Sequence, residues 1–264
     1  MEVGFCTPRP ILQPCSLEGH AYQVDPYIGC EHDCHYCYAR NDTEVDWPRQ
    51  ILIHRDLEQR LSLELRGIPP QSVYVGMNCD PYQPAERSRL QTRRLLELLT
   101  ERGFTVCMLT KSPLIARDLD LFETMTDPYL GFSVAFQDES TRSLFEGNAP
   151  TNAARLQSLA TLRSAGIRTY ALICPVMPYI TDVEAVLDAV VPLVDHVYVY
   201  RLKMHAETDA NWRRVERILN RHFAELTHRY RRVAFTDDDP YWRDLFDRLR
   251  ALPVPDGVEL SIEL

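Results

Sequence analysis

Residues 72–109, SVYVGMNCDPYQPAERSRLQTRRLLELLTERGFTVCML, contain the pattern that decides the fold. The stretch begins and ends with short runs of β-branched and aromatic residues, at 72–76 and 104–109, which are typical of strands. Between these runs, residues 87–102 have the spacing of an amphipathic helix, and Gly103 stands where the residue after a helix C-terminus belongs. A strand, a helix and a second strand in this order predict a parallel pair joined by a right-handed crossover.

The same alternation runs along most of the chain. Further strands are expected at residues 22–25, 129–135, 168–173 and 196–200, and further helices at 57–66, 115–125, 152–165, 183–191 and 211–229. Strands that read as buried apolar runs and alternate with helices predict an α/β fold with a parallel sheet. A closed eight-stranded barrel takes about 250 residues, which is more than this chain offers beside its N-terminal arm and a long cysteine-rich loop. We therefore expect a partial (β/α)6 barrel.

The chain divides, in this interpretation, into three parts of one domain. Residues 1–21 are expected to form a short irregular N-terminal arm rich in proline and cysteine, and residues 22–230 the partial barrel. Residues 231–264 are expected to add a C-terminal β/α extension, with a strand at 233–236, a helix after Pro240 and a half-exposed closing strand at 257–262.

Composition and charge argue against several classes of protein. A net charge of -9 and a pI near 5.4 argue against a broad basic face for duplex nucleic acid, and leave only a local basic patch open. No apolar run approaches the roughly 20 residues that a bilayer requires. The first ten residues, MEVGFCTPRP, lack the basic start and apolar core of a secretory signal, so we expect a cytoplasmic protein with reduced cysteines.

Three cysteines stand close together after the first expected strand. Cys30, Cys34 and Cys37 have the spacing C-x3-C-x2-C. Structural zinc takes four ligands, so a zinc site here requires His32 or His35 as well. A 4Fe-4S cluster also takes four thiolates in most proteins, and three leave one iron free to bind a small chelating molecule. The spacing favours the cluster and leaves zinc as the alternative.

This spacing, with an aromatic residue before the last cysteine, resembles the radical S-adenosylmethionine (SAM) superfamily. Residues 26–40, followed by Asn-Cys-Asp-Pro-Tyr-Gln-Pro-Ala-Glu at 78–86, more narrowly resemble its spore photoproduct lyase-like branch, also described as DNA repair photolyase-like. The likeness runs from about residue 22 to residue 182 and continues through 109–112, 131–133, 145–150 and 155–156. The residues after about 182 are not diagnostic of this branch.

The resemblance implies a partial barrel of the radical SAM type and two cofactors. A 4Fe-4S cluster is expected on Cys30, Cys34 and Cys37, with SAM chelated by the fourth iron. Its reductive cleavage gives a 5′-deoxyadenosyl radical that abstracts hydrogen from the substrate, and the electron comes from an external reductant of the flavodoxin or ferredoxin type. The site is expected at the barrel mouth, where the strands have their C-terminal ends.

The resemblance also implies roles for individual side chains. The residues expected to bind SAM or to support its binding are Tyr36, Asp80, Lys111, Ser133, Glu146 and Arg155. The residues expected to take part in hydrogen transfer are Tyr36, Tyr38 and Cys79. Each has an ordinary structural alternative, such as core packing for a tyrosine, helix capping for Asp80 or a surface ion pair for Glu146 and Arg155.

The resemblance favours a nucleic-acid or nucleotide substrate and lyase or repair chemistry. Because the chain is acidic, a radical tailoring enzyme that acts on a small metabolite or peptide is the first alternative. A non-catalytic zinc-binding nucleic-acid module is the second. The arginines at 213, 214, 217 and 221 are spaced like one helix face, which is either solvated surface or an edge that contacts phosphates.

Overall fold

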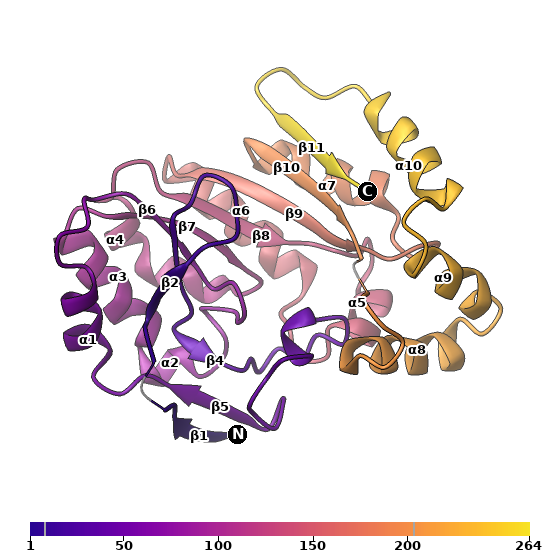
Figure 1. Cartoon of the computed structure of the whole chain (residues 1–264). Coiled ribbons are helices and arrows are strands. Elements are labelled where there is room, and N and C mark those ends of the chain that lie inside the picture. Colours follow the sequence, from indigo (N-terminus) through magenta and orange to yellow (C-terminus); the bar gives the residue numbers. More distant parts are fainter. Residues whose placement is uncertain (8, 203) are drawn as a thin grey trace.

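The computed structural model describes residues 1–7, 9–202 and 204–264, and an open eight-stranded sheet forms its centre. The strands are β2 (Leu12–Pro14), β3 (Tyr22–Val24), β6 (Ser72–Val75), β7 (Thr105–Thr110), β8 (Tyr129–Ser133), β9 (Arg168–Val176), β10 (His196–Arg201) and β11 (Glu259–Glu263). Their order is β11-β10-β9-β8-β7-β6-β3-β2, and all neighbours are parallel except β2 and β3 (Figure 1). Among the described strands β2 and β11 remain open edges, so the fold is the predicted partial α/β barrel.

Helices cover the outer face of this sheet. The elements that contribute to this outer core are α1 (Leu57–Glu64), α3 (Gln91–Glu101), η2 (Pro113–Asp118), α4 (Leu119–Phe122), α6 (Asn152–Ser164), α7 (Val183–Val190) and α10 (Pro240–Arg250). Alternate strand residues such as Val73, Val106 and Val197 are fully buried against them. This burial supplies most of the apolar area that stabilises the barrel.

The opposite, inner face of the sheet is lined by tyrosines. Tyr74, Tyr170 and Tyr198 occupy the alternate positions of β6, β9 and β10, and they form a separate cluster with Cys107 and Tyr129. The rings of Tyr129 and Tyr170 lie 4.5 Å apart. The two faces of one sheet therefore differ, because side chains alternate along each strand.

A second, three-stranded sheet braces the cysteine-rich loop. It consists of β1 (Glu2–Phe5), β5 (Gln50–Ile53) and β4 (Tyr27–Ile28), in that order. The prediction of an irregular N-terminal arm was therefore wrong for residues 2–5 and 12–14. Strand β1 pairs with β5, which lies far along the chain, and such a pairing leaves no local signal in the sequence.

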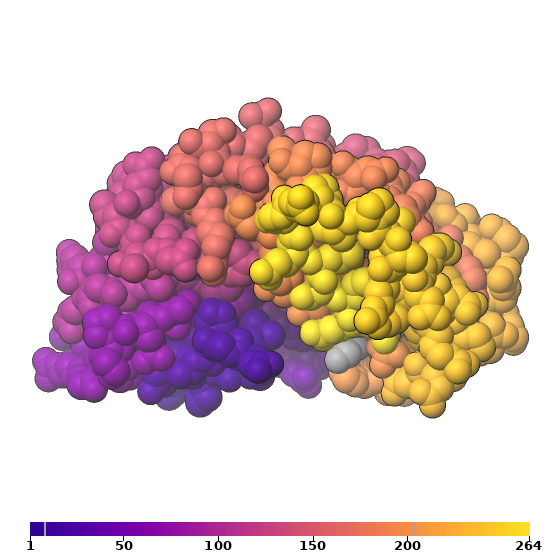
Figure 2. Space-filling view, turned by 90° about the horizontal axis from the view of Figure 1, so that it is seen from above, coloured from indigo at the N-terminus to yellow at the C-terminus, as the bar shows by residue number. Residues whose placement is uncertain are grey.

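The remaining elements lie around the second half of the barrel. They are α2 (Glu86–Arg89), η1 (Tyr38–Arg40), α5 (Glu139–Phe145), η3 (Val191–Leu193), α8 (Ala210–His222) and α9 (Thr227–Ala234). A second buried cluster includes Phe145, Trp212 and Tyr230 from α5, α8 and α9. Figure 2 shows the indigo N-terminal and yellow C-terminal segments along one edge of the molecule, with the middle of the chain forming the opposite edge.

All six expected barrel strands are present, whereas four details of the helices and tail differ. Residues 115–125, expected as one helix, fall in the 3-10 helix η2 and the short helix α4. Residues 87–102 form two helices because Leu90 adopts a left-handed conformation, with φ 56°. Residues 211–229 likewise contain the end of one helix and the start of another, α8 and α9. The strand predicted at 233–236 was wrong: Tyr230 and Val233 are buried at helical spacing, so this apolar pair belongs to α9.

The helix after Pro240 and the closing strand are confirmed as α10 and β11. In the described part of the chain, no helix has both the length and the apolar character needed to cross a membrane.

Candidate active site

The cysteine-rich loop, residues 29–40, lies against the chain segment that follows α5. Cys34 pairs with Glu146 in an isolated antiparallel bridge. The His35 amide donates to the Phe145 carbonyl at 2.8 Å, and the Asn148 amide donates to the His32 carbonyl at 3.1 Å. These contacts bring the first and second halves of the barrel together at the loop.

The three thiols of this loop are close enough to influence one another. Burial raises the pKa of Cys30, Cys34 and Cys37, that of Cys34 to about 12. Cys34 raises the pKa of Cys30 further, and Cys37 raises that of Cys34. All three are free thiols. Within the ranges that the structure describes, no three Cys, His, Asp or Glu side chains converge on a single metal ion. Three neighbouring thiols could hold a 4Fe-4S cluster and would leave one of its irons without a protein ligand.

A buried polar network lies next to the thiol of Cys34. Glu146 is its centre: it accepts hydrogen bonds from the Tyr36 hydroxyl and from Arg155, and its Oε1 lies 3.8 Å from Lys111 Nζ. Lys111 Nζ donates to Ser133 Oγ at 2.8 Å. Burial opposes ionisation of Glu146, but Arg155 and Lys111 outweigh it, so the pKa of Glu146 is lowered. Five of the predicted residues thus form one connected group.

Asp80 adjoins this group through the backbone of Lys111. Its carboxylate accepts hydrogen bonds from Thr110 Oγ1 at 2.6 Å and from the Lys111 amide at 2.8 Å, and it lies 3.1 Å from His32 Nε2. Burial alone raises the pKa of Asp80, but His32 and these hydrogen bonds overcome it and lower the pKa to about 2. Asp80 therefore joins the ends of β6 and β7 to the cysteine-rich loop as a carboxylate.

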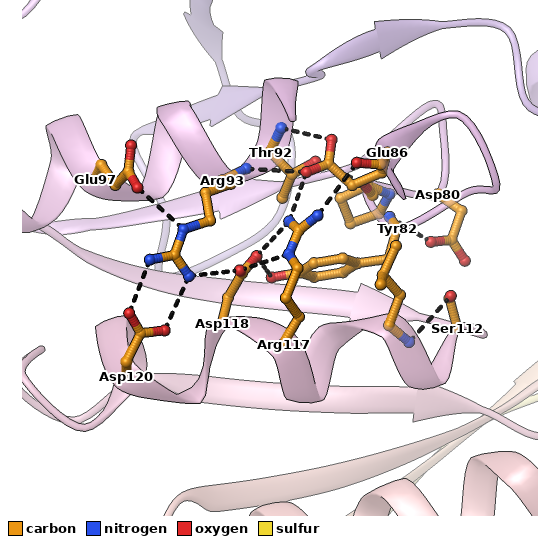
Figure 3. Close-up of polar contacts among 12 residues, drawn as sticks. Asp80, Tyr82, Glu86, Thr92, Arg93, Glu97, Ser112, Arg117, Asp118 and Asp120 are labelled. Atoms are coloured by element: carbon orange, nitrogen blue, oxygen red, sulfur yellow. Dashed lines mark hydrogen bonds and ion pairs between the residues drawn. The ribbon is translucent and has the colours of Figure 1, made fainter. Parts of the chain in front are cut away.

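A second network links the segment between β6 and α3 to the start of α3 and to η2. The Glu86 carboxylate accepts from the amides of Thr92 and Arg93, so it caps α3, and it also pairs with Arg117 at 2.7 Å (Figure 3). Arg117 in turn pairs with the buried Asp118 at 2.7 Å. Figure 3 shows Asp80 at one end of this group, where it accepts a hydrogen bond from the Tyr82 amide. Glu86 thus fixes the segment that follows Asp80 to the start of α3 and to Arg117.

Two of the predicted residues lie apart from the group around Glu146. The Tyr38 side chain is 51% exposed, and its hydroxyl donates to the Met77 carbonyl. Cys79 is buried in an apolar cluster with Tyr27 and Cys30, and its Sγ lies 3.7 Å from Asp25 Oδ1. Burial raises the pKa of Cys79, so it is a protonated thiol on the side of the loop that faces β4 and β5.

Some supporting residues escaped the sequence analysis. Asp25, directly after β3, accepts hydrogen bonds from the amide and the side chain of Asn78, both at 2.8 Å. Gln83 is fully buried and spans the loop backbone, with its Nε2 on the Gly29 carbonyl and its Oε1 on the Glu31 amide. The sequence did contain a signal for these residues, since Asp25 directly follows a strand and Asn78 and Gln83 belong to the 78–86 motif.

The α8 helix also holds the cysteine-rich loop. Asn211 Nδ2 donates to the Tyr36 carbonyl at 3.3 Å. Arg214 donates to His35 Nδ1 at 3.0 Å and to both carboxylate oxygens of Asp33 at 3.0 Å. His32 and His35, the two histidines considered as zinc ligands, thus have other partners: His35 contacts Arg214 and His32 contacts Asp80.

Comparison with known families agrees with this geometry. A profile of the Radical SAM superfamily matches residues 24–190, which include the cysteine-rich loop and every predicted site residue. The chain belongs to the radical SAM superfamily. This radical SAM protein is therefore an enzyme, with a 4Fe-4S cluster and SAM as its cofactors, and the zinc-binding module considered as an alternative is excluded.

Curated proteins from an archaeon and a bacterium are similar in sequence, and both are described as uncharacterized proteins. One, from Methanocaldococcus jannaschii, is 28% identical over 203 residues, which cover 75% of this radical SAM protein and 76% of the relative. Another, from Mycobacterium tuberculosis, is 31% identical over 179 residues, 63% of this chain. The match covers 53% of the mycobacterial relative, about half of its length.

Solved structures confirm the fold. A spore photoproduct lyase variant with dinucleoside spore photoproduct superposes with a TM-score of 0.70 at 13% identity, over 99% of this chain and 81% of the other. Streptococcus suis SuiB bound to S-adenosylmethionine gives a TM-score of 0.51 at 13% identity, over 91% and 57%. At these identities the likeness establishes the radical SAM fold alone.

Proposed function

We propose that this enzyme holds its 4Fe-4S cluster on Cys30, Cys34 and Cys37 and uses SAM bound beside Lys111 for lyase-type chemistry on a nucleic-acid or nucleotide substrate. The observation that carries the proposal is the position of the Cys34 thiol beside Lys111 and Glu146. Burial has the largest effect on the pKa of this thiol and raises it, Lys111 lowers it, and Glu146 raises it. A cluster ligand thus adjoins the polar group at the C-terminal ends of the strands. When bound, the two cofactors supply a 5′-deoxyadenosyl radical for hydrogen abstraction.

The charges of the group around Glu146 suit an anionic ligand. Lys111 and Arg155 carry two positive charges, and Glu146 balances one of them. Arg155 is fully buried and has its donors on Glu146 and on backbone carbonyls, so it positions other groups. Lys111 is left to hold the methionyl carboxylate of SAM by a charge-assisted hydrogen bond.

The other predicted residues have complementary parts in this proposal. Ser133, next to Lys111 Nζ, offers a hydroxyl for the ribose of SAM, and Asp80 supplies a carboxylate for the methionyl amino group. Glu146 and Arg155 position Lys111 and Tyr36. The hydroxyls of Tyr36 and Tyr38 and the thiol of Cys79 remain the predicted groups for hydrogen transfer.

The inner face of the sheet supports a substrate with flat rings. Tyr74, Tyr129, Tyr170 and Tyr198 line this face, and aromatic side chains of this kind stack on nucleobases without strong sequence preference. The likeness in fold to spore photoproduct lyase agrees with this substrate class. The net charge of -9 favours a second candidate, a small metabolite or a peptide held within the barrel. Reduced thiols suit a cytoplasmic location.

The proposal is tested by anaerobic reconstitution with iron and sulfide. Dithionite and SAM are added, and 5′-deoxyadenosine is quantified together with bound iron. We expect the wild-type protein to bind iron and to produce 5′-deoxyadenosine, and the Cys34→Ala variant to do neither. Cys15→Ala, which changes a partly exposed thiol of the N-terminal arm, is the matched control and should keep both. A colourless wild-type protein that binds one zinc and yields no 5′-deoxyadenosine contradicts the proposal.

The substrate class is tested with the same reconstituted enzyme. Dinucleotides that carry thymine damage are compared with undamaged dinucleotides, and the products are separated by mass. Conversion of the damaged dinucleotide supports the lyase proposal. Absence of conversion, together with nucleic-acid binding that is weak and independent of salt, supports the small-molecule candidate, because phosphate contacts make binding salt-dependent.

A further inference from the structure

One face of α8 presents a basic pocket beside the cysteine-rich loop. Arg214, Arg217 and Arg221 follow one another at helical spacing and line a cavity of about 220 Å³. The other lining residues are His35, Leu144, Ile218 and His222. The cavity is therefore lined by both apolar and positively charged side chains, and we refer to it as the basic pocket.

The charge of the basic pocket is only partly balanced. Arg214 pairs with Asp33, which also pairs with the buried Arg40. In the described part of the chain, no acidic side chain pairs with Arg217 or Arg221, and both of them are exposed. The chain as a whole carries a net charge of -9, so the group of arginines at this pocket is opposite in sign to the net charge.

Arg214 and Arg217 lie close enough together for the charge of one to affect the other. Burial and Arg217 lower the pKa of Arg214. Like charges that depress each other's protonation are costly to hold together, and an anionic partner relieves that cost.

The pocket contacts the cysteine-rich loop at His35, and Lys111 is not among its lining residues. His35 follows Cys34 directly, so their Cα atoms are about 3.8 Å apart. The thiol of Cys34 is next to Lys111 and Glu146, whereas the imidazole of His35 contacts Arg214 on α8. A partner seated in the pocket thus comes within one residue of a proposed cluster ligand and does not occupy Lys111 or Ser133, which do not line the pocket.

We propose that the basic pocket is the docking surface for an acidic one-electron donor protein of the flavodoxin or ferredoxin type. This inference rests on the proposed function, since it assumes a cluster on Cys30, Cys34 and Cys37. In the step that it serves, the donor loses one electron and the oxidised cluster gains it, and no bond forms or breaks. Electrostatic complementarity of this kind accelerates encounter and orients the partners.

The position of the pocket favours a donor over nucleic-acid phosphates. A substrate strand must reach the side of the loop where Lys111 and Ser133 lie, because the radical is generated there. The basic pocket is lined mainly by residues of α8, and neither Lys111 nor Ser133 lines it. An electron donor has no such requirement, since it needs only proximity to the cluster.

The first test measures binding and needs no cluster. Purified flavodoxin is titrated onto the apoprotein by calorimetry at low and high salt. The double variant Arg217→Glu/Arg221→Glu should bind at least tenfold more weakly than wild type at low salt. The control Arg66→Glu/Arg243→Glu changes the charge equally at two exposed arginines outside α8 and outside the pocket, and should bind within twofold of wild type. Equal binding of both double variants overturns the proposal.

The second test separates docking from chemistry. Reconstituted enzyme is assayed for 5′-deoxyadenosine with reduced flavodoxin and, separately, with dithionite. The pocket variant should lose most of the flavodoxin-driven rate and keep the dithionite-driven rate. If wild-type enzyme fails with dithionite although donor binding depends on the pocket, the proposed function is wrong and the docking surface stands. If the pocket variant loses binding of single-stranded DNA but not of flavodoxin, the pocket is a phosphate site and the docking proposal is wrong.

Discussion

Glu146 and Arg155 form an ion pair in which both side chains are completely buried. The remaining donors of Arg155 are used as well: Nη1 donates to the Ser133 carbonyl at 2.9 Å, and Nε donates to the Pro150 carbonyl at 3.0 Å. The pair therefore ties the end of β8 to the segment after α5, which itself pairs with the cysteine-rich loop. Charges held in this way are stable only while every partner is present.

Loss of the Glu146 carboxylate should destabilise the whole barrel mouth. In Glu146→Gln the buried guanidinium of Arg155 loses its counter-charge, so the free energy of unfolding should fall by about 3–5 kcal/mol. Urea denaturation of the apoprotein at pH 7 measures this. The control is Arg163→Ala, which removes a surface pair with Asp195 and should cost no more than about 1 kcal/mol. Similar losses in both variants contradict the structural role assigned to the buried pair.

Asp80 should make the stability depend on pH in the acid range. Its pKa lies at about 2 in the folded chain and near its ordinary value of 3.8 when unfolded, so its contribution is complete above that value and is lost as the pH falls toward 2. The Asp80→Asn variant should therefore lose about 2 kcal/mol at pH 7 and less at pH 3. Asn in place of the exposed Asp188 should change little at either pH. Unfolding curves at the two pH values provide the measurement, and a difference that does not shrink at pH 3 argues against the role of Asp80.

Lys111 should control SAM binding without affecting cluster assembly. Lys111→Gln keeps a hydrogen-bond donor near Ser133 but removes the charge, and a charge-assisted hydrogen bond contributes about 1.5–3 kcal/mol. The dissociation constant for SAM should therefore rise roughly tenfold to a hundredfold. Iron content should remain that of wild type, because Cys30, Cys34 and Cys37 are untouched. A variant that loses iron while binding SAM normally would show that Lys111 supports the cluster instead.

The barrel was predictable because its strands carry a local signal. Buried runs such as residues 72–75 and 196–200 are rich in β-branched and aromatic residues, and glycines follow several of the helices between them. The site residues were found on short motifs at the ends of these strands, and the structure joins Tyr36, Lys111, Ser133, Glu146 and Arg155 in one network.

Contacts between distant segments were not predictable in the same way. Asn211 and Tyr36 are 175 positions apart, and nothing in either stretch indicates that α8 supports the cysteine-rich loop. The same reason explains the missed pairing of β1 with β5. The strand expected at 233–236 was wrong because a short apolar run fits either a strand or one buried turn of a helix, and only packing against Trp242 decides between them.

The glycine at 131 should prove necessary for the tyrosine face that we assign to the substrate. A Cβ at this position would lie 2.4 Å from the ring of Tyr170, so in Gly131→Ala the ring must move away from its contact with Tyr129. Overpacking of this kind costs about 1–3 kcal/mol. If the clash is the cause, Gly131→Ala should cost little in a Tyr170→Ala background, because the ring is then absent. Urea denaturation of the two single variants and the double variant measures the coupling, and strictly additive losses would show that Gly131 is required for another reason.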